Sequence, residues 1–70
     1  MNAGNRKKSW IKYLLSLPIV QQRDYGEIRT ELREDKERNY SVVIRYENNE
    51  YDMSVGTDCF PKEELIEKYL

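Results

Sequence analysis

Residue types that commonly carry enzyme chemistry are nearly absent from this chain. It contains no histidine, so the commonest acid–base group and the nucleophilic dyads and triads built on it are missing. Its one cysteine, Cys59, lies near the expected start of a C-terminal helix, where thiols are often reactive. No base lies near it in the sequence, so we interpret Cys59 as a small packing residue. The sequence predicts a protein that is not an enzyme.

Metal and cofactor sites are equally unsupported by the residue pattern. A lone cysteine without histidine cannot build a zinc site. The polar residues 48–52 lack the spacing of a calcium loop and its distal glutamate. A phosphate-binding loop needs clustered glycines. The three glycines instead stand alone, at Gly4, Gly26 and Gly56. We therefore expect no cofactor and no metal.

The charges are divided unevenly along the chain. Residues 1–23 carry five of the 12 basic residues and none of the 13 acidic ones. A basic N-terminal arm could contact nucleic-acid phosphates, with Trp10 and Tyr13 stacking on bases. The cations of this arm are Arg6, Lys7, Lys8 and Lys12. No nucleic-acid reading module accompanies them, and Trp10 and Tyr13 are expected in the core, so nucleic-acid binding is the second hypothesis.

Tyrosines and acidic residues point to a protein partner. Tyrosine is enriched in binding patches, and two of the six tyrosines, Tyr25 and Tyr40, have no evident core role and flank loops. An acidic field could steer the chain onto a basic protein surface. The candidate acidic contacts are Glu31, Glu34, Asp35, Glu37, Glu47 and Glu50. The leading hypothesis is a non-catalytic protein-binding module, a regulator or inhibitor of a larger complex. Such modules are common in phages and mobile elements, which is a general expectation only.

The size of the chain leaves a third hypothesis open. Seventy residues form one domain with a small core. One cysteine excludes an internal disulfide, so a homodimer or structural homo-oligomer is a further way to gain stability. One cysteine and many charges suit the cytoplasm. The apolar segment 10–20 is interrupted by Lys12 and too short to cross a membrane, so no membrane association is expected.

The N-terminal part is predicted to be an arm followed by a helix. Residues 1–8 are polar and basic and are expected to form a flexible arm, with the domain spanning 9–70. Ser9 is a suitable N-cap for a helix from Trp10. Pro18 should end that helix near Leu17. Residues 19–25 are expected to form a connection.

Residues 26–38 allow two interpretations. Apolar and charged residues alternate from Glu27 to Arg33, which is typical of a strand with one face in water. Asp24 and Glu27 have capping-box spacing, which would suit a helix. Gly26 in the first turn disfavours the helix, so we favour the strand.

A β-hairpin is predicted over residues 40–55. Asn48 and Asn49 suit a two-residue turn because asparagine tolerates positive φ. The resulting register pairs Tyr46 with Tyr51, Arg45 with Asp52, Ile44 with Met53 and Val42 with Val55. It gathers the apolar residues on one face. A last helix then starts at Pro61, whose missing N–H is harmless there.

Together these elements predict an α+β fold. The expected order is α-β-β-β-α, a three-stranded antiparallel meander whose N- and C-terminal helices cover the same face. The other face of the sheet would then be exposed to water.

Overall fold

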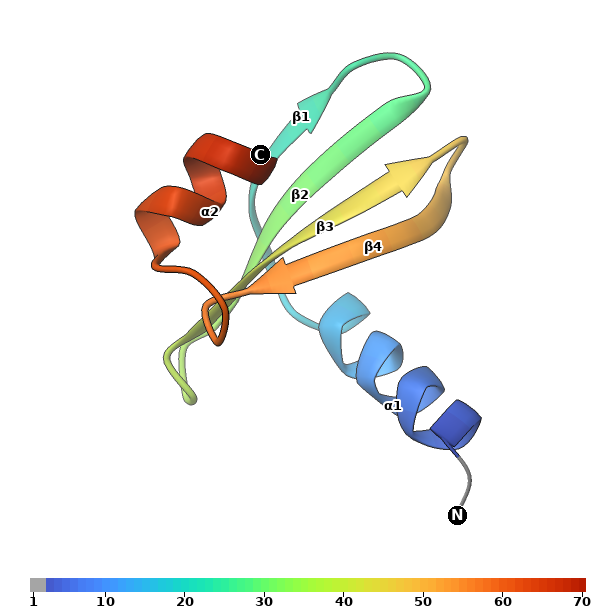
Figure 1. Cartoon of the computed structure of the whole chain (residues 1–70), viewed down its shortest axis with the longest axis vertical. Coiled ribbons are helices and arrows are strands. Elements are labelled where there is room, and N and C mark those ends of the chain that lie inside the picture. Colours follow the sequence, from blue (N-terminus) through green and yellow to red (C-terminus); the bar gives the residue numbers. More distant parts are fainter. Residues whose placement is uncertain (1–2) are drawn as a thin grey trace.

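The computed structural model describes the backbone of residues 3–70 and the side chains of residues 8–70, and it confirms the α+β class (Figure 1). Met1 and Asn2 of the predicted arm lie outside the described residues. The elements in chain order are α1 (Ala3–Leu15), β1 (Ile19–Asp24), β2 (Ile28–Asp35), β3 (Tyr40–Glu47), β4 (Glu50–Gly56) and α2 (Lys62–Tyr69). The favoured strand within residues 26–38 is confirmed as β2.

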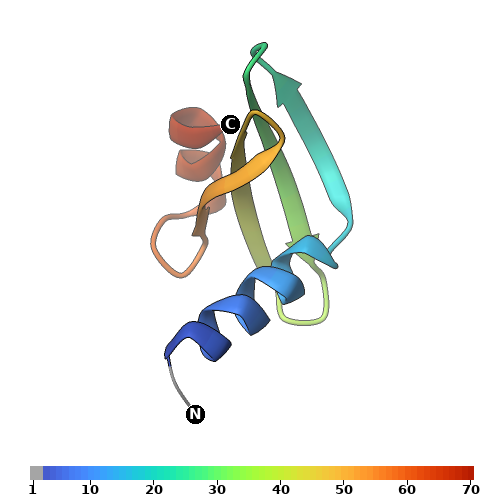
Figure 2. The same cartoon turned by 90° about the vertical axis from the view of Figure 1, so that its right-hand side faces the viewer.

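The sheet has four strands instead of the three predicted. They form an antiparallel meander in the order β1-β2-β3-β4 (Figure 2). The segment expected to be a connection is β1, which pairs with β2 from Gln21 opposite Leu32 to Asp24 opposite Arg29. All six residues of β1 are exposed. Because no side chain of this edge strand is buried, its sequence does not alternate between apolar and polar residues. The sequence therefore gives no strand signal and resembles that of a loop.

The β3–β4 hairpin confirms the predicted turn and corrects part of the predicted register. Asn48 and Asn49 have φ values of 52° and 66°. Tyr46 faces Tyr51 as expected, but a bulge at Asp52 shifts every later pair by one residue. The observed pairs are Arg45 with Met53, Ile44 with Ser54, Val43 with Val55 and Val42 with Gly56. The bulge turns Met53 away from Ile44 and toward the opposite face of the sheet.

The two helices cover opposite faces of the sheet, so the prediction of one shared face was wrong (Figure 1). Leu14 of α1 and Leu17, two residues after the helix ends, pack on one face, and α2 packs Leu65 on the other. The first cluster includes Val42, Ile44 and Tyr46, and the second includes Leu32, Val43 and Leu70. Successive strand residues point to opposite faces, so the apolar run 42–44 needs cover on both. We call the two sides the α1 face and the α2 face.

Both helix starts differ from the sequence prediction. Helix α1 begins at Ala3, so Ser9 lies inside the helix and is not its N-cap. Trp10 was expected in the core but is 44% exposed, with its ring 5.3 Å from that of Tyr13 and 6.0 Å from that of Tyr40. Helix α2 begins at Lys62, which places Pro61 at the N-cap position. The N-terminal end of α1 projects beyond the sheet (Figure 1).

Candidate protein-binding groove

Glu31, a predicted surface contact, lies inside the protein at 4% exposure. It is on the α1 face, where one carboxylate oxygen accepts hydrogen bonds from the Arg33 guanidinium at 2.7 and 3.0 Å and from the Tyr46 hydroxyl at 2.7 Å. Burial, followed by the hydrogen bond to Glu31, raises the pKa of the Tyr46 phenol. Arg33 also donates to the carbonyls of Leu15 and Leu17 at the end of α1. A buried carboxylate held this closely is not available to a partner.

Arg29, which is partly exposed, completes this charged cluster. Its guanidinium carbon lies 4.4 Å from the centre of the Tyr46 ring, and its Nε lies 3.5 Å from Glu31. Its Nη1 donates to the Asn49 side chain at 3.2 Å. Glu31, Arg33 and Tyr46 bond one another, whereas the Nε of Arg29 is buried without a hydrogen-bond partner among the described residues. We interpret the cluster as the structural link between α1 and the sheet.

Most acidic candidates near the β2–β3 turn are engaged within the chain. Glu34 forms an ion pair with Lys62, whose hydrogen bond is the main cause of a lowered pKa at Glu34. Asp35 accepts a hydrogen bond from the Tyr13 hydroxyl, which lowers the pKa of Asp35 and raises that of Tyr13. Glu37 remains exposed.

The predicted contacts do not share one surface. Tyr40 begins β3, is half-buried and lies 3.4 Å from Asp58 through its hydroxyl. Tyr25 follows β1 at the other end of the sheet and is 57% exposed, more than any other large apolar side chain described. Glu47 and Glu50 flank the β3–β4 turn and are exposed. Tyr25 and Tyr40 therefore cannot contact the same short segment of a partner.

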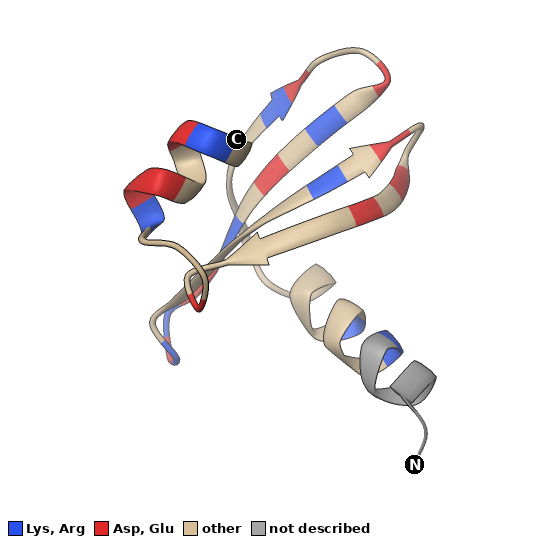
Figure 3. Cartoon of the chain, viewed as in Figure 1, with Lys and Arg blue, Asp and Glu red and all other residues tan. Residues whose placement is uncertain are grey.

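The basic candidates lie on α1. Lys8 and Lys12 are exposed, and the side chains of Arg6 and Lys7 lie outside the described residues. Residues 3–15 contain no acidic residue. Figure 3 shows only basic and uncharged positions along the described part of this helix. With Trp10 partly exposed beside them, these lysines form a basic aromatic surface on the projecting helix.

Alkaline solution is expected to destabilise the fold between pH 10 and about pH 12. Burial, then the nearby charge of Asp58, raises the pKa of Tyr40 to about 12, and the pKa values of Tyr13 and Tyr46 are also raised. In the unfolded chain tyrosine ionises near pH 10. The stabilising contribution is therefore complete below pH 10 and is lost as pH rises through the folded pKa. Urea unfolding at stepped pH, with phenolate absorbance, measures the loss.

The variant Tyr40→Phe is the matched control for this pH dependence. It lacks the phenol that ionises near pH 12, so its absorbance titration should lose that late step. An unchanged alkaline titration in this variant would contradict the assignment.

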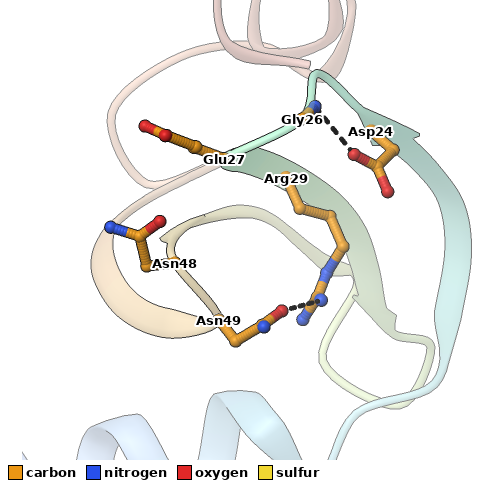
Figure 4. Close-up of a pocket in the computed structure, with 6 residues that line it drawn as sticks. All are labelled: Asp24, Gly26, Glu27, Arg29, Asn48 and Asn49. Carbon is orange, nitrogen blue, oxygen red and sulfur yellow. Dashed lines mark hydrogen bonds between the residues drawn. The ribbon is translucent and has the colours of Figure 1, made fainter.

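A small polar hollow lies between the β1–β2 and β3–β4 turns (Figure 4). Its volume is about 210 Å³. The Gly26 N–H donates to the Asp24 carboxylate at 2.9 Å, and the Asn48 N–H donates to the carbonyl of Glu27 at 2.8 Å. The lining residues are Asp24, Gly26, Glu27, Arg29, Asn48 and Asn49. Because these groups bond one another, we interpret the hollow as the junction of two turns.

A larger groove lies on the α2 face, where α2 leaves part of the sheet uncovered. Its volume is about 460 Å³, and its lining comes from all four strands and the end of α2. The lining residues are Arg23, Tyr25, Ile28, Thr30, Arg45, Met53, Glu67, Lys68, Tyr69 and Leu70. Eight of these ten are arginine, tyrosine, methionine, isoleucine, leucine or lysine side chains that offer either apolar area or positive charge, including the exposed Tyr25 and Met53.

Hydrogen bonds between the sheet and the end of α2 shape the groove. The Tyr25 hydroxyl donates to the main-chain oxygen of Leu70 at 2.7 Å, and the Thr30 hydroxyl donates to the same oxygen at 3.3 Å. Thr30 and Leu70 are buried. The Tyr25 ring is thus held at one side of the groove by its hydroxyl, with most of its surface still in contact with solvent.

The groove lining holds three basic side chains and one acidic side chain. Arg45 forms an ion pair with Asp52, and Lys68 lies 3.9 Å from Glu64. Arg23 is an exposed lining residue on β1. Glu67 is the single carboxylate side chain in the lining. The pairing of Lys68 with Glu64 is solvent-exposed and therefore weak, so Arg23 and Lys68 can attract an acidic ligand.

Sequence reasoning found Tyr25 but missed the rest of the groove. Arg23 lies on the unpredicted strand β1, and Met53 reaches the α2 face only because of the bulge at Asp52. Lys68 and Tyr69 join the lining only because α2 covers the face opposite α1. No single-sequence signal brings these positions together.

Other chemistry-bearing positions give no further site among the described residues. Cys59 is exposed, so its predicted role as a buried packing residue was wrong. Residues 8–70 hold no cluster of three potential metal ligands. Within the same part of the chain, no helix has the length and apolar character needed to cross a membrane. Comparison of the chain with protein families, with curated proteins and with solved structures gave no match.

Proposed function

We propose that the chain is a non-catalytic protein-binding module that holds a segment of another protein in the α2-face groove. The observation that supports this most strongly is the lining of the groove by exposed Tyr25 and Met53 beside Arg23. Tyrosine, methionine and arginine are the residue types enriched at protein interfaces. A rigid tyrosine anchored at its hydroxyl also loses little side-chain entropy on binding.

The groove favours a segment that is both apolar and acidic. Tyr25, Ile28 and Met53 offer apolar area, while Arg23 and Lys68 offer positive charge on the same surface. The preferred partner therefore differs from the basic surface expected from the acidic residues. Regulation or inhibition of a larger complex is a role that such a module could fill by occupying a partner's segment.

A pair of charge substitutions tests this function. Met53→Glu places a carboxylate in the groove at a side chain that is 38% exposed, and Leu15→Glu places one at a similarly exposed side chain outside it. Both proteins should remain folded by circular dichroism. Affinity capture from cells that express the chain, with and without nuclease, should recover a protein partner with the wild type and Leu15→Glu. Met53→Glu should reduce that recovery at least tenfold, which corresponds to about 1.4 kcal/mol.

Two results would overturn the proposal. One is equal recovery of the protein partner by Met53→Glu and the wild type. The other is recovery of nucleic acid alone, with no protein that survives nuclease treatment.

Nucleic-acid binding through α1 is the second candidate, supported by exposed Lys8 and Lys12 beside Trp10. Phosphate contacts of this kind make affinity fall steeply with salt. If α1 binds nucleic acid, Lys8→Glu with Lys12→Glu should abolish a gel shift of mixed-sequence DNA or RNA, whereas Met53→Glu should leave it unchanged. The two candidate functions are thus separated by which variant loses binding.

A further inference from the structure

Strand β1 presents an open edge to solvent. It is the border of the sheet beyond β2, and Figure 2 shows no helix or strand beside its outer edge. Its apolar residues Ile19 and Val20 are 47% and 53% exposed. An uncovered edge with exposed apolar side chains is a template for pairing with another strand.

The direction of the free main-chain groups can be assigned from the β1–β2 hairpin. The Tyr25 N–H donates to the carbonyl of Ile28 at 2.7 Å, so the main-chain groups of Tyr25 point toward β2. Residues alternate in this respect along an antiparallel pair. The N–H and C=O groups of Gln22 and Asp24 therefore point outward, away from β2, where a further strand would bond them.

The opposite border of the sheet is less suited to pairing with an identical strand. Strand β4 begins with Glu50, contains Asp52 at its bulge and carries no basic residue. Charged residues and bulges are devices that protect an edge. Strand β1 also has an irregularity in its register, at Val20 between Ile19 and Gln21. From Gln21 to Asp24, however, its register with β2 is unbroken, and its two charges, Arg23 and Asp24, are of opposite sign.

We propose that β1 pairs antiparallel with β1 of a second copy of this chain, about a twofold axis at Gln22. An isologous contact of this type closes after two copies. Gln22 would exchange two main-chain hydrogen bonds with Gln22 of the second copy. The two sheets would join into one sheet of eight strands.

Charge selects this register over those centred on Arg23 and Asp24. A twofold axis at Arg23 or Asp24 would place identical charges directly opposite each other, which is destabilising. With the axis at Gln22, Gln21 lies opposite Arg23 of the second copy. Both side chains point to the α2 face, because they pair with Leu32 and Thr30 of β2. Ile19 and Val20 of one copy would then lie beside the Asp24–Tyr25 segment of the other, which covers exposed apolar surface on both.

Opposite charges introduced at Gln21 test the register in solution. Gln21→Glu creates two symmetric Glu–Arg23 pairs and should tighten the dimer, while Gln21→Arg creates two Arg–Arg23 contacts and should weaken it. Each dissociation constant is expected to change by roughly 2- to 30-fold, in opposite directions. Sedimentation equilibrium up to several hundred micromolar chain measures the constants, and urea unfolding checks that both variants are folded.

Cross-linking tests the position of the axis. In a Cys59→Ser background, Gln22→Cys should form a disulfide dimer under mild oxidation, because directly opposite Cα atoms are about 5.5 Å apart. Glu37→Cys, exposed on the β2–β3 turn, is the collision control and should cross-link at least tenfold more slowly.

A wild-type protein that stays monomeric throughout the concentration range would overturn the proposal. So would Gln21 variants that shift association in the same direction, or equal cross-linking rates for the two cysteine variants. Arg23 and Tyr25 belong both to the groove lining and to this interface, whereas Met53 belongs to the groove alone. Loss of partner capture by Met53→Glu and a change of self-association in the Gln21 variants are therefore separate outcomes.

Discussion

The variant Arg33→Ala is expected to lose about 3–5 kcal/mol of unfolding free energy, the usual cost of removing one member of a buried ion pair. Arg33 is 12% exposed at its side chain and donates to Glu31 and to two carbonyls at the end of α1. Its removal leaves the buried Glu31 carboxylate with the Tyr46 hydroxyl as its hydrogen-bond donor and with the Nε of Arg29 at 3.5 Å. It also releases the last turn of α1 from the sheet.

Urea unfolding followed by circular dichroism measures this loss. Arg23→Ala is the matched control, because Arg23 is exposed on β1 and its truncation should change stability by about 0.5 kcal/mol or less. Arg33→Lys should be intermediate, since an ammonium group cannot reproduce the planar fork that reaches Glu31 and the helix carbonyls together. Equal stabilities of Arg33→Ala and Arg23→Ala would show that the cluster does not hold α1 in place.

Leu14→Ala is expected to destabilise the fold by about 2–5 kcal/mol, the range for truncating a fully buried leucine. Leu14 is 0% exposed and packs with Val42, Ile44 and Tyr46. The loss combines apolar transfer with the cavity left under α1. A domain of this size has a total stability of only about 5–15 kcal/mol, so a large fraction of the unfolding free energy is at stake.

Leu15→Ala provides the control within the same helix. Leu15 is 41% exposed, so the same truncation one residue later should cost about 0.5 kcal/mol or less. Thermal unfolding of the three proteins at equal concentration gives the comparison. Similar losses at both positions would mean that α1 does not pack on the sheet through Leu14.

Elements with a buried face were predicted well from the sequence. The β3–β4 hairpin, its asparagine turn and strand β2 follow from alternation and turn chemistry, which are local properties. Strand β1 was missed because Gln21, Gln22 and Arg23 bury nothing. The bulge at Asp52 was missed because the predicted register already placed opposite charges and apolar residues together.

The arrangement of the elements was predicted less well, for a physical reason. The charged residues Arg29, Glu31 and Arg33 occupy alternate positions along β2, as they would on a solvent-exposed face of a sheet. Charged residues that form ion pairs with one another beneath a helix show the same alternation, so the sequence does not distinguish the two cases. The apolar run 42–44 was the signal that both faces are covered. The candidate groove depends on strand β1, on the bulge at Asp52 and on the face that α2 covers, so only Tyr25 was recognised in advance.

The meander topology has a consequence for how the chain reaches its native state. Every strand pairs with the one next to it in sequence, and each connection between strands is a short turn. The entropy lost on closing such loops is small, so each of the three hairpins can nucleate the sheet without waiting for a distant segment. The two helices, at the ends of the chain, then dock on the sheet and complete the fold. Partly folded intermediates with exposed apolar surface should therefore be short-lived.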